Sequence, residues 1–200
     1  MTQWPRYLSV LILLAGIPVA AHSADADANK KAASQKTPWQ TEQQLTPLAD
    51  VLKIVSKTTG RQFAASLRVP ADVTLGGLNA KNLDYPKFLQ ILENNNLAAI
   101  TVSGVTRIIP LAAIRQQPTP FVDLEETELD EGEWVTAVID TGEPSSARFV
   151  PALRPLMPAS AHLAAFHDDG LIVISDRLAN IRRIAAIITE IQTNSHDNAP

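Results

Sequence analysis

The sequence predicts an α+β protein made of two small domains. Short apolar runs typical of strands alternate with stretches in which apolar residues recur every three or four positions, as in amphipathic helices. The clearest example is residues 170–192, GLIVISDRLANIRRIAAIITEIQ, where an apolar strand leads into an amphipathic helix. An acidic, proline-containing stretch divides the elements into two groups, which favours two domains. We expect the first to have two helices against short β-sheets and the second to be a β-α-β-β-α unit.

Residues 1–23 have the pattern of a cleavable export signal. Arg6 precedes an apolar run at 8–20, and small residues allow cleavage between Ala21 and Ser23. The run has about 13 residues, fewer than the roughly 20 of a membrane-spanning helix, which favours cleavage over an uncleaved anchor. An exported chain without cysteine fits the bacterial periplasm. Residues 24–38 are small and polar, and we expect a disordered leader there.

The first domain is expected over residues 39–115. Gly60 follows a run of leucines and valines at helical spacing and favours the left-handed conformation that ends helices. Asp84 can cap a second helix by accepting hydrogen bonds from its first amides. The expected elements are a helix carrying Leu45, Leu48, Leu52 and Val55, strands at 62–65 and 73–78, a helix between Asp84 and Asn94, and a hairpin of 99–102 and 105–111 around Ser103-Gly104, with a short opening strand near Trp39 as an option.

Residues 116–132 are predicted to be an acidic linker. Pro118 and Pro120 interrupt regular structure, and seven acids with no base lie between Asp123 and Glu133. Like charges repel and keep a segment extended and solvated. The alternative is a docking strip for a basic partner.

The second domain is expected over residues 133–193, with a flexible tail at 194–200. A strand at 134–139 is followed by a helix that Ser145 caps and that Pro155 shortens or kinks. Strands at 161–166 and 171–175 then form a hairpin. Asp176 is expected to cap the final helix.

Composition and motifs argue against an enzyme. The chain has no cysteine and four histidines, and no serine lies in a G-x-S-x-G elbow. No glycine-rich phosphate loop occurs. The adjacent His167, Asp168 and Asp169 cannot all face one metal ion. We therefore expect no catalytic residues, no metal, no cofactor and no small-molecule substrate.

The β-α-β-β-α order of the second domain resembles that of KH folds, which bind nucleic acid. KH modules clamp the nucleic-acid backbone with a G-x-x-G loop, and this block has none. The formal net charge of −4 also opposes phosphate binding. We expect a KH-like unit that does not bind nucleic acid.

Both domains resemble the periplasmic N-domains of bacterial secretins, those of type II secretion in particular. The first is similar to the N-terminal domain shared by secretins and TonB-dependent receptors, through LADVL at 48–52, Thr59-Gly60 and RIIP at 107–110. The second carries the more specific match, LIVISDR at 171–177 with Asn180-Ile181. The resemblance covers about residues 41–192.

The resemblance implies a protein that works by protein–protein contact. Its partners would be secretion-system proteins, either a secretin ring or inner-membrane platform components, or it would form a ring of its own copies. We expect a scaffold or adaptor of a type II secretion or pilus-type machine in the periplasm, without an outer-membrane pore of its own. The alternative is a signalling or regulatory binding module like the N-terminal domains of TonB-dependent receptors.

Five arginines form the candidate interface. They make the second domain locally basic beside its acidic approach segment, and such asymmetry can steer head-to-tail neighbours in a ring. The alternative is an ordinary solvated helix face. The five are Arg148, Arg154, Arg177, Arg182 and Arg183.

Overall fold

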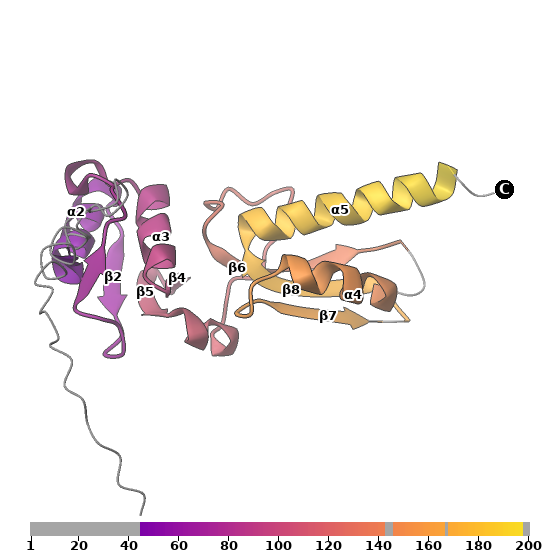
Figure 1. Ribbon diagram of the computed structural model, residues 1–200, viewed down its shortest axis with the longest axis horizontal. Coiled ribbons are helices and arrows are strands. Elements are labelled where there is room, and N and C mark those ends of the chain that lie inside the picture. Colours follow the sequence, from indigo (N-terminus) through magenta and orange to yellow (C-terminus); the bar gives the residue numbers. More distant parts are fainter. Residues whose placement is uncertain (1–44, 143–145, 167, 198–200) are drawn as a thin grey trace, which may run out of the picture. The chain divides into compact units, whose positions relative to one another are not determined.

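The computed structural model describes residues 45–142, 146–166 and 168–197 (Figure 1). The described residues form one compact unit. The predicted export signal, the leader, the Ser145 cap and His167 lie outside the described residues. We call residues 45–117 the N-terminal half, 118–133 the connecting segment and 134–197 the C-terminal half. The predicted α+β class is confirmed, whereas the domain boundaries stay a prediction.

The N-terminal half contains two small sheets and two α-helices. Strand β1 pairs antiparallel with β3, and β5 lies between β4, which is antiparallel, and β2, which is parallel. Its elements are β1 (Leu45–Pro47), α2 (Leu48–Thr59), β2 (Gln62–Ala65), β3 (Asp72–Thr74), η1 (Ala80–Asn82), α3 (Tyr85–Asn94), β4 (Leu97–Val102), β5 (Val105–Pro110) and η2 (Leu111–Gln116), where η denotes a 3₁₀ helix.

Helix boundaries in this half follow local chemistry. Asp84 caps α3 as predicted, because its carboxylate accepts the Lys87 N–H at 2.9 Å. Gly60 ends α2 with a φ of 70°. The helical periodicity wrongly includes Leu45, which lies in β1 with 66% of its surface exposed. Pairing with β3 keeps residues 45–47 extended, so α2 begins at Leu48.

The C-terminal half is the predicted β-α-β-β-α unit. Its sheet has the order β6-β8-β7 with antiparallel neighbours. Pro151 and Pro155 divide the first helical region into short pieces, because proline cannot donate the hydrogen bond that continues a helix. The elements are β6 (Trp134–Asp140), η3 (Ser146–Phe149), α4 (Val150–Leu153), η4 (Arg154–Leu156), β7 (His162–Phe166), β8 (Leu171–Arg177) and α5 (Leu178–Asp197).

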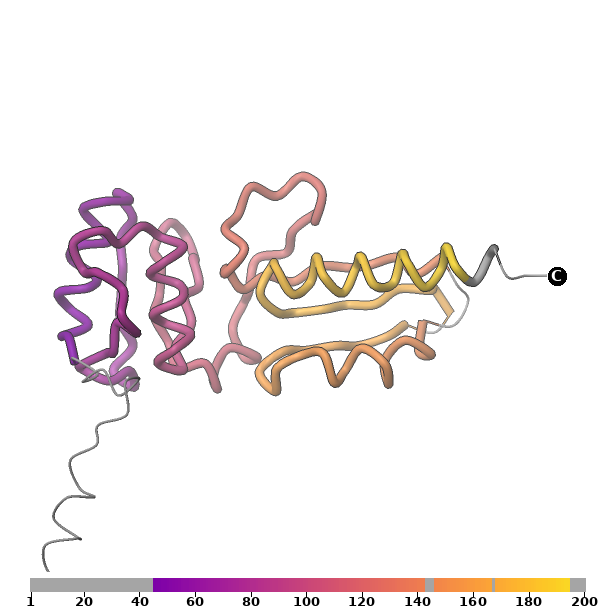
Figure 2. The backbone as a smooth tube through the Cα atoms, turned by 45° about the horizontal axis from the view of Figure 1, so that its top comes forward, coloured from indigo at the N-terminus to yellow at the C-terminus, as the bar shows by residue number. Residues whose placement is uncertain are grey.

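Helices α4 and α5 run alongside the strands of this half (Figure 2). Their buried residues share one core with the sheet. Alternate residues of β8, Ile172 and Ile174, are fully buried in this core. Helix α5 contributes Leu178, Ile181, Ile184 and Ile188, a stripe at steps of three and four. The helix continues to Asp197, beyond residue 193, the predicted end of the second domain. None of the helices in the described ranges combines the length and apolar character needed to cross a bilayer.

The start of α5 differs from the prediction. Asp176 lies inside β8 rather than at the cap, and its buried carboxylate accepts hydrogen bonds from the Arg177 N–H and the Asn180 side chain. The Leu178 and Ala179 N–H groups instead donate to two carbonyls of the connecting segment. These acceptors are the Glu133 oxygen, at 2.9 Å, and the Glu131 oxygen, at 3.0 Å. The cap is therefore supplied by a distant piece of backbone.

The connecting segment packs against the C-terminal half. Val122, Leu124 and Leu129 are partly buried against its core. Arg182 of α5 donates to the Leu124 and Thr127 carbonyls, at 3.2 and 3.1 Å, and pairs with the Glu131 carboxylate. The segment thus differs from the extended, solvated strip that its charges suggest, although most of its acids remain exposed.

Trp134 connects the two halves. It is the first residue of β6, yet its indole is buried in a cluster with Ala98, Ile100, Ile109 and Ile114 of the N-terminal half. Burying a tryptophan removes a large apolar area from water, so this contact joins the halves strongly.

We predict that Ile184→Ala will lower the free energy of unfolding by about 2–5 kcal/mol, because Ile184 is fully buried and the change leaves a cavity. Urea denaturation followed by circular dichroism measures the difference. The matched control, Ile191→Ala on the same helix, should cost about 0.5 kcal/mol or less, because Ile191 is 38% exposed. Equal losses in the two variants would contradict the placement of this core.

Candidate interaction groove between α3 and α5

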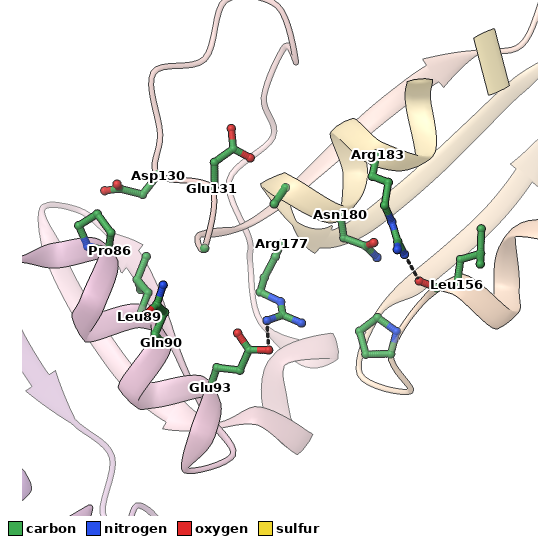
Figure 3. Close-up of a pocket in the computed structure, with 13 residues that line it drawn as sticks. Pro86, Leu89, Gln90, Glu93, Asp130, Glu131, Leu156, Arg177, Asn180 and Arg183 are labelled. Atoms are coloured by element: carbon green, nitrogen blue, oxygen red, sulfur yellow. Dashed lines mark hydrogen bonds and ion pairs between the residues drawn. The ribbon is translucent and has the colours of Figure 1, made fainter. Parts of the chain in front are cut away.

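A groove of about 680 Å³ opens between α3 and the start of α5 (Figure 3). The connecting segment and the turn after η4 form its remaining walls. Its lining combines apolar and charged side chains. The lining residues are Pro86, Leu89, Gln90, Glu93, Asp130, Glu131, Gly132, Leu156, Pro158, Arg177, Ala179, Asn180 and Arg183.

Ion pairs and hydrogen bonds hold the walls of the groove together. Arg177, at the end of β8, pairs with Glu93 of α3 across the groove (Figure 3). Arg183 donates to the Leu156 carbonyl at 2.6 Å and so fixes the turn at the rim. The Leu156 side chain is 40% exposed, which leaves an apolar contact at the edge.

Gly132 allows the connecting segment to approach α3 closely. A Cβ atom at this position would lie 3.1 Å from both Cβ and Cδ1 of Leu89. Such a contact is tighter than nine in ten real Cβ contacts, so a larger residue would require the Leu89 side chain or the segment to shift by a few tenths of an ångström. Gly132 therefore lets the segment pack directly against Leu89 at the wall of the groove.

A buried polar cluster lies beside this close approach. The Glu133 side chain is 4% exposed, and its carboxylate pairs with Arg61 at 3.3 Å. The Arg61 guanidinium stacks over the Tyr85 ring, 3.9 Å from its centre. Burial raises the pKa of the Glu133 carboxyl, and the positive charge of Arg61 only partly offsets this effect. Burial, together with the Glu133 charge, also raises the pKa of Tyr85.

The five candidate interface arginines lie in different surroundings. Arg177 and Arg183 line the groove, whereas Arg182 lines a second groove beside β6. Arg154 donates to the Ala161 carbonyl at 3.2 Å, and the Arg148 guanidinium lies 5.0 Å from the Phe149 ring centre. Each thus has a partner within the chain, and their role as a common interface stays a prediction.

The lining of the groove contains no histidine, serine or threonine, and two of its charged groups, Glu93 and Arg177, neutralise each other. Within the described residues, no three acidic or histidine side chains gather closely enough to hold a metal ion.

Sequence reasoning missed Gly132, Glu133 and Leu156. Gly132 and Glu133 directly precede a predicted strand. A glycine at the start of a strand, after an acidic run, was the one local signal of a close backbone contact at this point. Their partners Leu89 and Arg61 are distant in sequence, so nothing local indicates the contacts.

We predict that Glu133→Gln stabilises the chain relative to wild type most strongly at neutral pH. Because the folded-state pKa of Glu133 is raised, the folded protein binds this proton more tightly than the unfolded chain does, and wild-type stability falls as pH rises through the raised value. The advantage of the glutamine variant should therefore shrink as pH falls toward 4.5, the ordinary value for this group.

Urea denaturation of both proteins across this pH range gives the difference in unfolding free energy. Glu126→Gln, at an exposed site of the same segment, is the control and should show no such gain. A difference that does not vary with pH would contradict the burial of an ionised Glu133.

No protein-family model matches the chain. The secretin XcpQ of Pseudomonas aeruginosa is 27% identical over 200 residues, an alignment that covers 94% of this chain and 29% of XcpQ. The chain therefore spans less than a third of the length of this relative.

Among solved structures, a chain of the Klebsiella pneumoniae type II secretion system outer membrane complex of PulD, PulS and the PulC HR domain has a similar fold. The TM-score is 0.59 at 19% identity, over 74% of this chain and 26% of that chain. The crystal structure of the N-terminal domain of XcpQ from Pseudomonas aeruginosa has a TM-score of 0.28 at 24% identity, over 73% and 61% of the two chains. In sequence the chain resembles the N-terminal region of the secretin XcpQ, and in fold it is similar to part of a type II secretion outer membrane complex.

Proposed function

We propose that the chain is a non-enzymatic protein–protein interaction module of a type II secretion machine. The observation that carries the proposal is the similarity to XcpQ, which extends over 94% of the chain. An alignment of that extent includes both halves and the connecting segment. The similarity in fold to the PulD-containing complex gives independent support.

The proposed location is the periplasm. The secretin resemblance supports this location, and so does the export-signal pattern of the sequence. The absence of cysteine fits a fold that depends on core packing alone, without disulfides.

The proposed partner is a protein like PulC. The complex with the similar fold contains the HR domain of PulC beside PulD and PulS. We propose that this chain binds the corresponding HR domain encoded by its own organism.

The groove between α3 and α5 is the proposed contact surface. Its lining combines apolar residues, among them the 40% exposed Leu156, with charged residues such as Arg177 and Glu93, which pair with each other. Protein–protein interfaces likewise combine apolar with polar side chains. The ion pair of Arg177 with Glu93 keeps the walls in place before a partner arrives, which lowers the entropy cost of binding.

We predict that the full mature chain binds this HR domain saturably and that Leu156→Asp weakens binding by about tenfold or more, a loss of ~1.4 kcal/mol. Isothermal titration calorimetry measures both affinities. The reason is that a charge replaces the apolar contact at the rim.

Leu67→Asp is the matched control, since Leu67 is fully exposed and lies in the turn after β2, outside the groove lining. The proposed partner is wrong if the wild-type chain does not bind the HR domain. The proposed surface is wrong if Leu156→Asp binds as well as Leu67→Asp does.

A further inference from the structure

Strand β6 is an edge strand whose first part is already covered. The connecting segment runs beside it in parallel, with Phe121 opposite Thr136. The Thr136 N–H donates to the Pro120 carbonyl at 2.7 Å, and the Val122 N–H donates to the Thr136 carbonyl at 2.9 Å. The outward backbone groups of Thr136 are therefore satisfied from within the chain.

The cover ends after Val122. Asp123 begins a turn, in which its carbonyl accepts the Thr127 N–H at 3.1 Å and its carboxylate accepts the Glu125 N–H at 2.9 Å. In an antiparallel pair, the backbone N–H and carbonyl groups of successive residues point alternately toward and away from the neighbouring strand. The N–H and carbonyl of Val138 therefore point away from β8, as those of Thr136 do. No residue in the described ranges bonds to the outward N–H and carbonyl of Val138.

A second groove lies along this uncovered part of β6. Its volume is about 560 Å³, and its walls come from β6, α5 and residues 121–125. Phe121 is 72% exposed and Val138 is 41% exposed, so two apolar side chains meet water at this edge. Unpaired strand edges with exposed apolar side chains are sites where another strand can add.

The lining of this groove carries a net negative charge. The guanidinium of Arg182 is held by Glu131 and by the carbonyls of Leu124 and Thr127. The other charged residues of the lining are Asp123 and Glu125. A second copy of the chain paired through the same edge would bring these acids together, which is unfavourable.

We propose that the β6 edge binds an extended, apolar and basic segment of a different protein, which adds as a strand beside Val138. Backbone hydrogen bonds to Val138 would supply affinity, Phe121 and Val138 would contact alternate apolar side chains, and Asp123 and Glu125 would select basic ones. This inference does not depend on the proposed secretion function, because it concerns a different surface.

The test uses the full mature chain and two synthetic seven-residue peptides, one alternating valine with lysine and one alternating valine with glutamate. Fluorescence polarisation gives the affinities, and amide hydrogen exchange gives the contact site. We predict that the lysine peptide binds at least about tenfold more tightly than the glutamate peptide and slows exchange at Val138. Equal affinities, or protection confined to other elements, would overturn the proposal.

Val138→Pro removes the outward N–H and leaves the hydrogen bonds to β8 in place, because proline at an edge position lacks only the outward donor. We expect it to bind the lysine peptide at least about tenfold more weakly, whereas Val138→Thr should stay within about twofold. Circular dichroism establishes that both variants are folded.

If Val138→Pro does not fold, a lysine peptide with N-methyl groups on alternate residues tests the same hydrogen bonds from the other side. It should not bind the wild-type chain. Undiminished binding by the methylated peptide would overturn the proposal. Where Val138→Pro does fold, concentration-dependent self-association of the wild-type chain that this variant abolishes would also overturn it.

Discussion

The first turn of α5 carries backbone N–H groups that the helix itself cannot satisfy, and much of the structure depends on how they are satisfied. Two of them bond to the carbonyls of Glu131 and Glu133. This backbone cap fixes the end of the connecting segment against the helix. Gly132 then lies against Leu89, the Glu133 side chain reaches Arg61, and Trp134 enters the cluster of the N-terminal half. These two hydrogen bonds thus hold in place the short stretch of chain whose side chains contact the N-terminal half.

The connecting segment lines two grooves. Its last residues form a wall of the groove between α3 and α5, and its first residues form a wall of the groove beside β6. Between these two walls, the Arg182 guanidinium donates hydrogen bonds to the Leu124 and Thr127 carbonyls and so anchors the middle of the segment. The two grooves therefore share one stretch of backbone that Arg182 anchors.

Elements with strong local signals could be predicted from the sequence. The stripe of isoleucines in α5, the alternation in β8 and the Asp84 cap depend on neighbours within a few residues, and each agrees with the structure. Asp176 has a side chain that can cap a helix, but β8 continues through this residue. Carbonyls of the connecting segment accept the first N–H groups of α5 instead. Charges dominate the connecting segment in sequence, yet its burial is decided by the apolar residues between the acids, which pack against the core of the C-terminal half. The partners of Arg177 and Arg182 are distant in sequence, so no local pattern indicates them, and the role of the five arginines as a common interface stays a prediction.

The position of Trp134 has a consequence for any attempt to study the halves separately. A fragment that ends with the acidic stretch contains Ala98, Ile100, Ile109 and Ile114 but lacks the indole that covers them. Those side chains would then face water, and the fragment would be prone to self-association. A soluble N-terminal piece therefore has to extend through the first residues of β6, and an autonomous C-terminal piece should carry a polar residue in place of Trp134.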